Sequence, residues 1–279
     1  MILPRRQAEL SRSAVFFDTS LMNIVFSPIA RIETDFRTKF GVPRQSGLVP
    51  ELAGRIVFEP PYRNADALRG LEGFTHIWLL WVFHAADGSL LRTDTTTPPP
   101  PLRPTVRPPR LGGNVRMGVF ATRSPFRPNP IGLSAVRIDR MEPHTERGPI
   151  IHVLGADLMD GTPILDIKPY LPFADAIHDA TGGYTDQTRR QQPLDVVLPD
   201  PVRALLVGHY ALSETQVSSL VAVLAQDPRP HYQDDPTRLY GIDFAGLDIR
   251  FRVEDGHLYV ADVQEPAKTL VSSSRFHSS

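Results

Sequence analysis

Hydrophobic residues recur in short runs through the first two thirds of the chain, and most of these runs predict β-strands. The longest run, at residues 75–85, is rich in β-branched and aromatic side chains and is short for a helix, which predicts a buried strand. The other expected strands are residues 29–32, 55–58, 117–122, 134–141, 152–158 and 164–167. Only residues 65–71 suggest a helical turn. Strands of this length and spacing predict a mainly β fold with a closed sheet or barrel.

Two Asp-Gly pairs predict the turns of β-hairpins. Asp160-Gly161 separates the expected strands at 152–158 and 164–167, and Asp255-Gly256 interrupts the alternating pattern of residues 247–260. This pair favours a tight turn because it accepts the positive φ that such a turn requires.

The hydrophobic period changes to that of a helix after a polar stretch at residues 181–193. Ser213 and Gln216 are spaced as a capping box, and the stripe that follows is Val217, Leu220, Val221 and Leu224. We therefore expect a disordered leader at 1–23, a β-barrel domain at 24–192, a small α+β domain at 193–265 and a tail at 266–279.

Composition excludes several classes of protein. The 28 prolines among 279 residues, about twice ordinary usage, disfavour a mainly helical fold. The chain has no cysteine, which excludes disulfides, thiolate zinc sites and a cysteine nucleophile. Its longest apolar stretch, residues 77–83, is too short to cross a bilayer, and residues 1–23 form a poor signal peptide. We expect a cytoplasmic protein without a membrane partner.

Positive charge is concentrated in residues 95–138, although the formal net charge of the chain is only −1. This segment has no Asp, Glu or Lys and contains seven arginines, at 103, 107, 110, 116, 123, 127 and 137. Guanidinium groups favour forked contacts with phosphate or carboxylate and stacking on bases. The segment is either an anion-binding surface or a solvated basic face that pairs with acidic residues elsewhere. Its many Pro, Gly, Asn and Ser residues favour the first interpretation.

Familiar catalytic signatures are missing from the sequence. It contains no P-loop, dinucleotide-binding glycine motif or nucleophile elbow. His76 and His84 would lie about 26 Å apart on one strand, so we expect no metal site. What remains is a set of Pro- and Gly-rich loops that hold arginines rigidly, as a preorganised pocket requires. Asp157, Asp160 and Asp166 surround the first predicted hairpin, either as catalytic carboxylates or as ordinary turn residues.

Several motifs, taken together and in this order, resemble the TsaA-like or TrmO family of S-adenosylmethionine-dependent tRNA methyltransferases. They are residues 43–48, 64–72, 76–78, 107–114, 123–132, 160–170 and 224–232. The resemblance implies a single-sheeted β-barrel, a homodimer with its sites near the subunit interface, and a tRNA anticodon stem-loop as partner. The implied reaction is methyl transfer to the exocyclic N6 of N6-threonylcarbamoyladenosine at position 37.

The family's cofactor contacts carry over to five parts of this chain. By the resemblance, S-adenosyl-L-methionine is bound by Arg44, Gln45, Ser46, Gly47, Leu48, His84, Ala85, Arg123, Leu133, Leu154, Gly155, Ala156 and Asp157. The sequence departs from the family pattern in its leader, in the Thr/Pro-rich insert at 93–101 and in its tail.

Chemistry suggests the roles of the remaining candidates. The attacking nitrogen is conjugated and needs a base to remove its proton, for which Asp160 and Asp157 are the candidates. The candidate substrate contacts are Arg107, Arg110, Arg127, Asn129, Lys168, Tyr170, Asp227 and Arg229. Asp227 and Arg229 fit a simple helix stop equally well. Two other functions stay open, a noncatalytic RNA-binding barrel and a methyltransferase of the same fold with another substrate.

Overall fold

The computed structural model describes residues 24–85, 102–108, 111, 115–188, 193–229 and 235–266. The predicted leader, the Thr/Pro-rich insert, Arg110 and all but the first residue of the predicted tail lie outside these segments. Within them, no helix has the length and apolar character that a membrane span requires.

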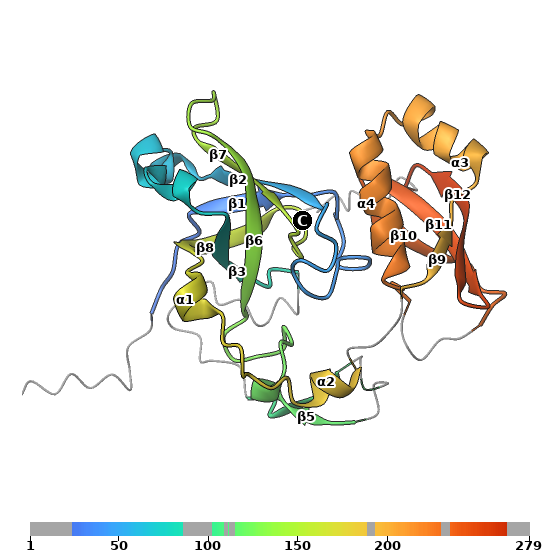
Figure 1. Cartoon of the computed structure of the whole chain (residues 1–279), viewed down its shortest axis with the longest axis horizontal. Helices are drawn as coiled ribbons and strands as arrows, with labels where there is room; N and C mark the ends of the chain where they lie inside the picture. The colour runs from blue at the N-terminus through green and yellow to red at the C-terminus, as the bar shows by residue number, and fades with distance from the viewer. Residues whose placement is uncertain are drawn as a thin grey trace, which may run out of the picture.

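Six antiparallel strands close into one barrel, which confirms the predicted fold class (Figure 1). Around the barrel they are β1 (Ala30–Glu33), β2 (Ala53–Phe58), β7 (Ile150–Leu154), β6 (Ile131–Glu142), β3 (His76–Val82) and β8 (Thr162–Pro169), which returns to β1. Alternate residues point inward, and those of β3 are Ile77, Leu79 and Trp81. Together with β-branched residues of the other strands they form a dry core.

The predicted hairpin at Asp160-Gly161 is wrong, although the turn itself is present. Gly161 has φ +73°, but β7 pairs with β2 and β6, whereas β8 pairs with β1 and β3. Residues 155–161 therefore cross from one part of the barrel to another. Their backbone is held by bonds from Gly155 N to Leu52 O (2.8 Å) and from Asp160 N to Phe36 O (2.7 Å). A turn residue fixes the local reversal of the chain but not the strand that follows it as a partner.

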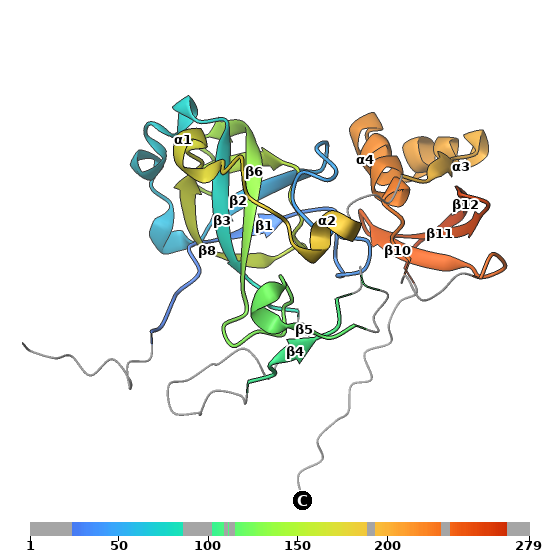
Figure 2. The same cartoon turned by 60° about the horizontal axis from the view of Figure 1, so that its bottom comes forward.

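The strand expected at residues 117–122 is largely a short helix. Only β5 (Met117–Gly118) is extended, and it pairs with β4 (Thr105–Val106). A 3₁₀ turn, η7, covers Val119–Ala121. The β4–β5 ribbon carries the start of the arginine-rich segment and lies outside the barrel wall (Figure 2).

Short helices connect the barrel strands. The helical turn expected at 65–71 is confirmed as η3 (Ala65–Leu68) and is followed by η4 (Leu71–Gly73), with η2 (Pro60–Tyr62) before it. After β8 come α1 (Pro172–Asp175) and α2 (Tyr184–Thr188).

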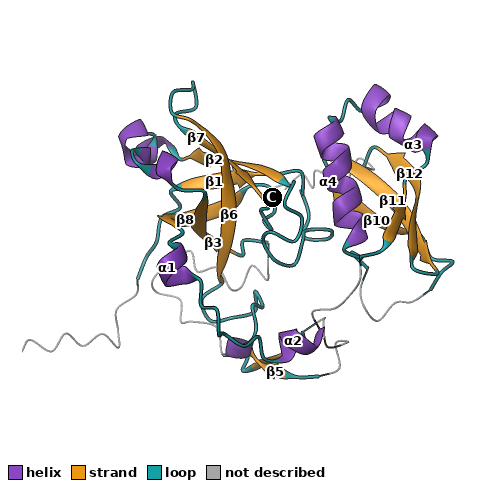
Figure 3. Cartoon of the chain, in the orientation of Figure 1, coloured by secondary structure: helices purple, strands orange, loops and turns teal. Residues whose placement is uncertain are grey.

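The C-terminal unit, residues 193–266, has a second sheet with helices on one face (Figure 3). Its strands are β9 (Asp195–Val197), β10 (Tyr240–Phe244), β11 (Leu247–Glu254) and β12 (His257–Gln264), in the order β10-β11-β12-β9. Its helices are α3 (Asp200–Ala204), the π-helix η8 (Leu205–His209) and α4 (Glu214–Ala225). The hairpin at Asp255-Gly256 and the capping box of Ser213 and Gln216 are both confirmed.

A long loop joins the two sheets into one packed structure. The described residues 34–52, between β1 and β2, contain neither helix nor strand. Three of their side chains, Phe36, Val49 and Leu52, are buried in the hydrophobic core of the C-terminal unit. A structureless loop of this length is uncommon in a compact domain unless it serves a function.

Candidate active site

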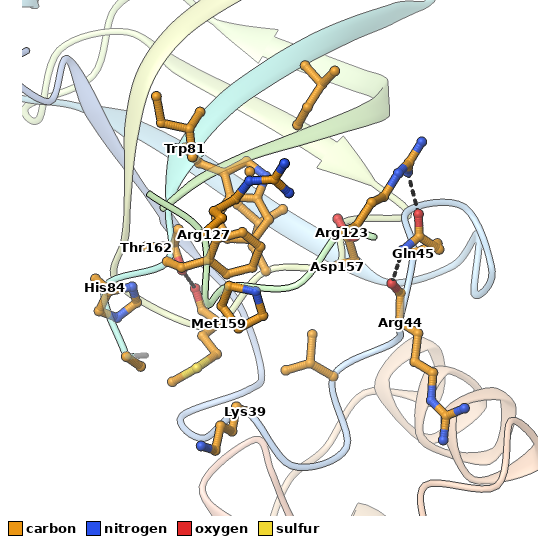
Figure 4. Close-up of a pocket in the computed structure, with 18 of the residues that line it drawn as sticks. Lys39, Arg44, Gln45, Trp81, His84, Arg123, Arg127, Asp157, Met159 and Thr162 are labelled. Atoms are coloured by element: carbon orange, nitrogen blue, oxygen red, sulfur yellow. Dashed lines mark hydrogen bonds between the residues drawn. The ribbon is translucent and has the colours of Figure 1, made fainter. Parts of the chain in front are cut away.

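A cavity of about 1000 Å³ opens where β3 ends and β6 begins (Figure 4). Its walls come from the 34–52 loop, the end of β3, the arginine-rich segment and the crossing segment 155–161. The predicted residues that line it are Arg44, Gln45, His84, Ala85, Arg123, Arg127, Asn129, Leu133 and Asp157. Segments far apart in the sequence thus meet at one site, as the resemblance implied.

Other predicted cofactor residues lie beside the cavity rather than on its wall. Gly47 donates its backbone N–H to Gly155 O at 2.9 Å, which ties the 34–52 loop to the crossing segment. The backbone of Ser46 hydrogen-bonds to Asp157. Ala156 is buried in the barrel core. Leu48 is partly exposed, and Leu154 is the last residue of β7; neither lines the cavity.

Asp160, one of the two candidate bases, is placed in a structural position. Its carboxylate accepts a hydrogen bond from Thr34 N at 3.0 Å, and it does not line the cavity. Among the described lining residues, Asp157 is the one carboxylate.

The predicted substrate residues do not share one location. Arg127 and Asn129 line the cavity, Arg107 is exposed at the end of β4, and Arg110 lies outside the described residues. Lys168 and Tyr170 lie at the far end of β8, where Lys168 pairs with Asp166 at 2.8 Å and the Tyr170 ring lies 5.5 Å from that of Trp78.

Asp227 and Arg229 belong to the C-terminal unit. They form a two-pronged ion pair, with Arg229 Nε and Nη2 each 2.9 Å from an Asp227 oxygen. This pairing satisfies the Asp227 carboxylate within the loop that ends α4. It supports the helix-stop interpretation at least as strongly as a substrate contact.

Aromatic side chains that the sequence analysis did not select form much of the cavity wall. The rings of Trp81 and Phe83 meet edge to face at 4.3 Å. A Cβ at Gly132 would lie 2.3 Å from the Trp81 indole, so only glycine lets β6 pass this close to the ring. The alternation of β3 could have identified Trp81 as an inward-facing residue. In the structure Trp81 pairs across the sheet with Gly132. The loop residues Lys39, Val42 and Pro43 carried no such signal.

A chain of hydrogen bonds holds Asp157 in the wall. Trp81 Nε1 donates to Ser134 Oγ at 3.0 Å, and Ser134 Oγ donates to Asp157 Oδ1 at 2.6 Å. Burial raises the pKa of the Asp157 carboxyl above its ordinary value, although Ser134 and the charge of Arg123 act in the opposite direction. Burial also lowers the pKa of His84, which keeps that imidazole neutral near pH 7.

Cations outnumber the single carboxylate at the cavity. Lys39, Arg44, Arg123 and Arg127 all line it, and Arg123 donates a hydrogen bond to Gln45, which in turn donates to the backbone of Arg44 (Figure 4). Within the described segments, no acidic side chain lies within 4 Å of the guanidinium of Arg107, Arg116, Arg123, Arg127 or Arg137. These five arginines are therefore not neutralised by acidic side chains of the described segments. Three or more metal-ligating side chains do not come together anywhere in the described residues.

Comparison with known proteins decides the family. The model for the tRNA-methyltransferase O N-terminal domain matches residues 31–176, and the model for the TrmO C-terminal domain matches residues 191–266. The chain belongs to the tRNA-methyltransferase O family. The two matched regions carry the barrel and the second sheet respectively.

Individual members of the tRNA-methyltransferase O family are similar over most of the chain. A tRNA (adenine(37)-N6)-methyltransferase of Escherichia coli K12 is 42% identical over 245 residues, which cover 82% of this chain and 93% of the relative. A protein of the same name from Eikenella corrodens is 45% identical over 66% of this chain and 93% of its own. A crystal structure of TrmO from Pseudomonas aeruginosa superposes with a TM-score of 0.69, at 35% identity over 88% of this chain and 99% of that one.

The raised pKa of Asp157 predicts that this carboxylate destabilises the free protein. The native state holds its proton more tightly than the unfolded chain does, so stability falls as the pH rises above the ordinary value of 3.8. Asp157→Asn should therefore raise the free energy of unfolding at pH 7, and the gain should shrink as the pH approaches 4. Urea unfolding across this range measures it. If Asp157→Asn gives no gain in the free energy of unfolding, or a gain that does not change with pH, the carboxyl of Asp157 does not have a raised pKa.

Proposed function

We propose that this chain is a tRNA (adenine-N6)-methyltransferase. It transfers a methyl group from S-adenosyl-L-methionine to the exocyclic N6 of N6-threonylcarbamoyladenosine at position 37, beside the anticodon. The observation that carries the proposal is the cavity itself. It combines aromatic rings, one buried carboxylate and a surplus of guanidinium groups, in a chain that aligns with 93% of a tRNA (adenine(37)-N6)-methyltransferase.

The groups that line the cavity fit the parts of S-adenosylmethionine. The faces of Trp81 and Phe83 suit the adenine ring or the sulfonium. The Arg123 fork suits the methionyl carboxylate. A cavity of about 1000 Å³ is ample for a ligand of this size. When bound, the cofactor supplies an electrophilic methyl group.

The chain's own residues contribute orientation and a base. The rigid Pro- and Gly-rich loops hold their side chains in fixed directions, and such positioning accounts for much of the rate of a transfer between two bound reactants. Asp157 is our candidate to accept the N6 proton, because its raised pKa makes it a stronger base than an exposed aspartate. The Ser134 hydroxyl donates to Asp157 Oδ1 at 2.6 Å and holds that oxygen in place. Asp160 takes no part, since its carboxylate caps the start of the 34–52 loop.

The surplus positive charge favours an anionic substrate. One guanidinium is enough for the methionyl carboxylate, and Lys39 and Arg127 line the cavity as well. A threonylcarbamoyl group carries a carboxylate close to the reacting nitrogen, and the tRNA backbone supplies phosphates. The exposed arginines of the β4–β5 ribbon extend this positive surface beyond the cavity. An adenosine without the threonylcarbamoyl group would lack the carboxylate and would leave part of this positive charge without a partner.

We also propose that two copies of the chain associate through the outer face of β3 and β6. Leu133 and Ile131 of β6 are 52% and 36% exposed, and they lie across from Leu80 and Val82 of β3. A barrel in water rarely leaves an apolar cross-strand patch uncovered. Because Leu133 also lines the cavity, a partner on this face would lie beside the active site. We propose a cytoplasmic location, since that is where most tRNA is available as substrate.

The direct test is a methyl-transfer assay with labelled cofactor. We expect label in the N6 position of tRNA that carries the threonylcarbamoyl group, and none in the same tRNA without it. Label in both tRNAs would indicate a related methyltransferase with another substrate. RNA binding without cofactor binding or transfer would indicate the noncatalytic barrel and overturn the proposal.

Substitution of two arginines from the same segment should impair two different binding steps. Arg123→Ala, at the cavity, should abolish measurable cofactor binding while tRNA still binds. Arg107→Ala, on the ribbon, should leave cofactor affinity unchanged and reduce the slope of log K for tRNA against log salt by about one unit. Calorimetry and salt-dependent filter binding measure the two effects. Equal losses by both variants in both assays would show that the pocket is misassigned.

The proposed dimer predicts a mass of about twice 31.1 kDa in sedimentation equilibrium. Leu133→Asp, which places a charge in the middle of the apolar face, should convert it to a monomer. A wild-type protein that sediments at the monomer mass at micromolar concentration would contradict this interface.

A further inference from the structure

The 34–52 loop contributes both to the wall of the cavity and to the core of the C-terminal unit. Its middle lines the cavity through Lys39, Val42, Pro43, Arg44 and Gln45. Its two ends, however, are buried in the C-terminal unit rather than in the barrel. One wall of the barrel cavity is thus anchored in the core of the C-terminal unit.

The first anchor of the loop is at Asp35 and Phe36. Phe36 is 1% exposed, and its ring meets that of Phe244 in β10 edge to face at 5.5 Å. Gln216 of α4 donates to Asp35 Oδ1 at 3.0 Å, and Ala245 N donates to Asp35 O at 2.7 Å. These contacts fix both the side chain and the backbone at the beginning of the loop.

The second anchor is at the other end. Val49 and Leu52 are buried in the same C-terminal core, and Ser219 of α4 donates to Glu51 O at 3.3 Å. Between the anchors, Gly41 packs against Ile242 of β10, where a Cβ would lie 3.2 Å from the isoleucine. Val42, the next residue, both lines the cavity and packs against the C-terminal core.

Hydrogen bonds to the crossing segment of the barrel hold this loop mainly near its two ends. Its backbone bonds to that segment involve Phe36, Gly47 and Leu52, all outside the cavity-lining stretch of 39–45. Within that stretch Gln45 accepts a hydrogen bond from Arg123 on the barrel side, whereas Val42 packs against the C-terminal core. The middle of the cavity-lining stretch, at Gly41 and Val42, is therefore packed against the C-terminal side.

We infer that the C-terminal unit positions the cofactor-binding wall of the barrel, with Phe244 and Gln216 as positioning residues that act through the 34–52 loop. This rests on the proposed function only in taking the cavity as the cofactor site. Two consequences follow. Loosening the C-terminal anchor weakens cofactor binding without touching the cofactor, and cofactor binding in turn stabilises the C-terminal unit, because such coupling is reciprocal.

A matched pair of variants separates positioning from general stability. Phe244 and Phe251 are both fully buried in the same core, but Phe244 packs on Phe36 of the loop whereas Phe251 stacks on Tyr240 of β10. The dissociation constant of S-adenosylhomocysteine, measured by calorimetry below the melting temperature of each protein, is the readout. We expect Phe244→Leu to weaken binding roughly 2- to 30-fold and Phe251→Leu to leave it within error of wild type, at similar losses of melting temperature.

A second variant covers the case in which Phe244→Leu fails to fold. Gln216→Glu keeps a capping-box residue at the start of α4 but places a carboxylate against Asp35. It should also weaken binding, while Gln226→Glu at the exposed end of the same helix should not. Hydrogen exchange of the wild type should show that S-adenosylhomocysteine slows exchange in α4 and β10.

The outcomes are distinguishable. Wild-type protein that does not bind S-adenosylhomocysteine would overturn the proposed function. Wild-type binding with equal effects of Phe244→Leu and Phe251→Leu, or with no effect of Gln216→Glu, would leave the function standing and overturn the positioning role.

Discussion

The position of β8 between β1 and β3 is the constraint on which the rest of the structure depends. Because β7 ends on the opposite side of β1 and β2, the chain must cross the end of the barrel before β8 begins. That crossing, residues 155–161, carries Asp157 to Ser134 and Trp81 and bonds to the backbone of the 34–52 loop. A simple hairpin would have left Asp157 on an exposed turn. Closure of the sheet thus creates both the core and the site.

The interior of the site combines features that oppose stability. A carboxylate is buried beside an indole, four cations surround one cavity, and a glycine replaces a side chain where the indole lies against β6. Each lowers the stability of the free protein, and each is explained by a ligand that brings a positive centre, a carboxylate and an aromatic ring. The stable cores of the barrel and of the C-terminal unit hold this arrangement in place. The two cores are joined by Phe36, Val49 and Leu52, so the site depends on both.

Local chemistry in the sequence predicted much of this structure, and non-local pairing accounts for what it missed. The strand period, the capping box of Ser213 and the turn at Asp255-Gly256 are local signals, and all three are confirmed. The hairpin at Asp160-Gly161 was wrong because β8 pairs with β1 and β3, both of which lie far from it in the sequence. The motifs pointed to Arg44, Arg123 and Asp157, which line one cavity, but no local pattern marks Lys39 or Val42. The place of Val42 is set by packing against the C-terminal core.

The most direct test of the central claim is whether the cofactor binds against Trp81. The chain has two tryptophans, and Trp78 lies on the outer face of β3, where its indole donates to Asp175. In a Trp78→Phe protein, Trp81 is the sole indole. Titration with S-adenosylhomocysteine should change its fluorescence saturably, with a midpoint equal to the calorimetric dissociation constant. Binding by calorimetry with unchanged Trp81 emission, or no binding at all, would contradict the account.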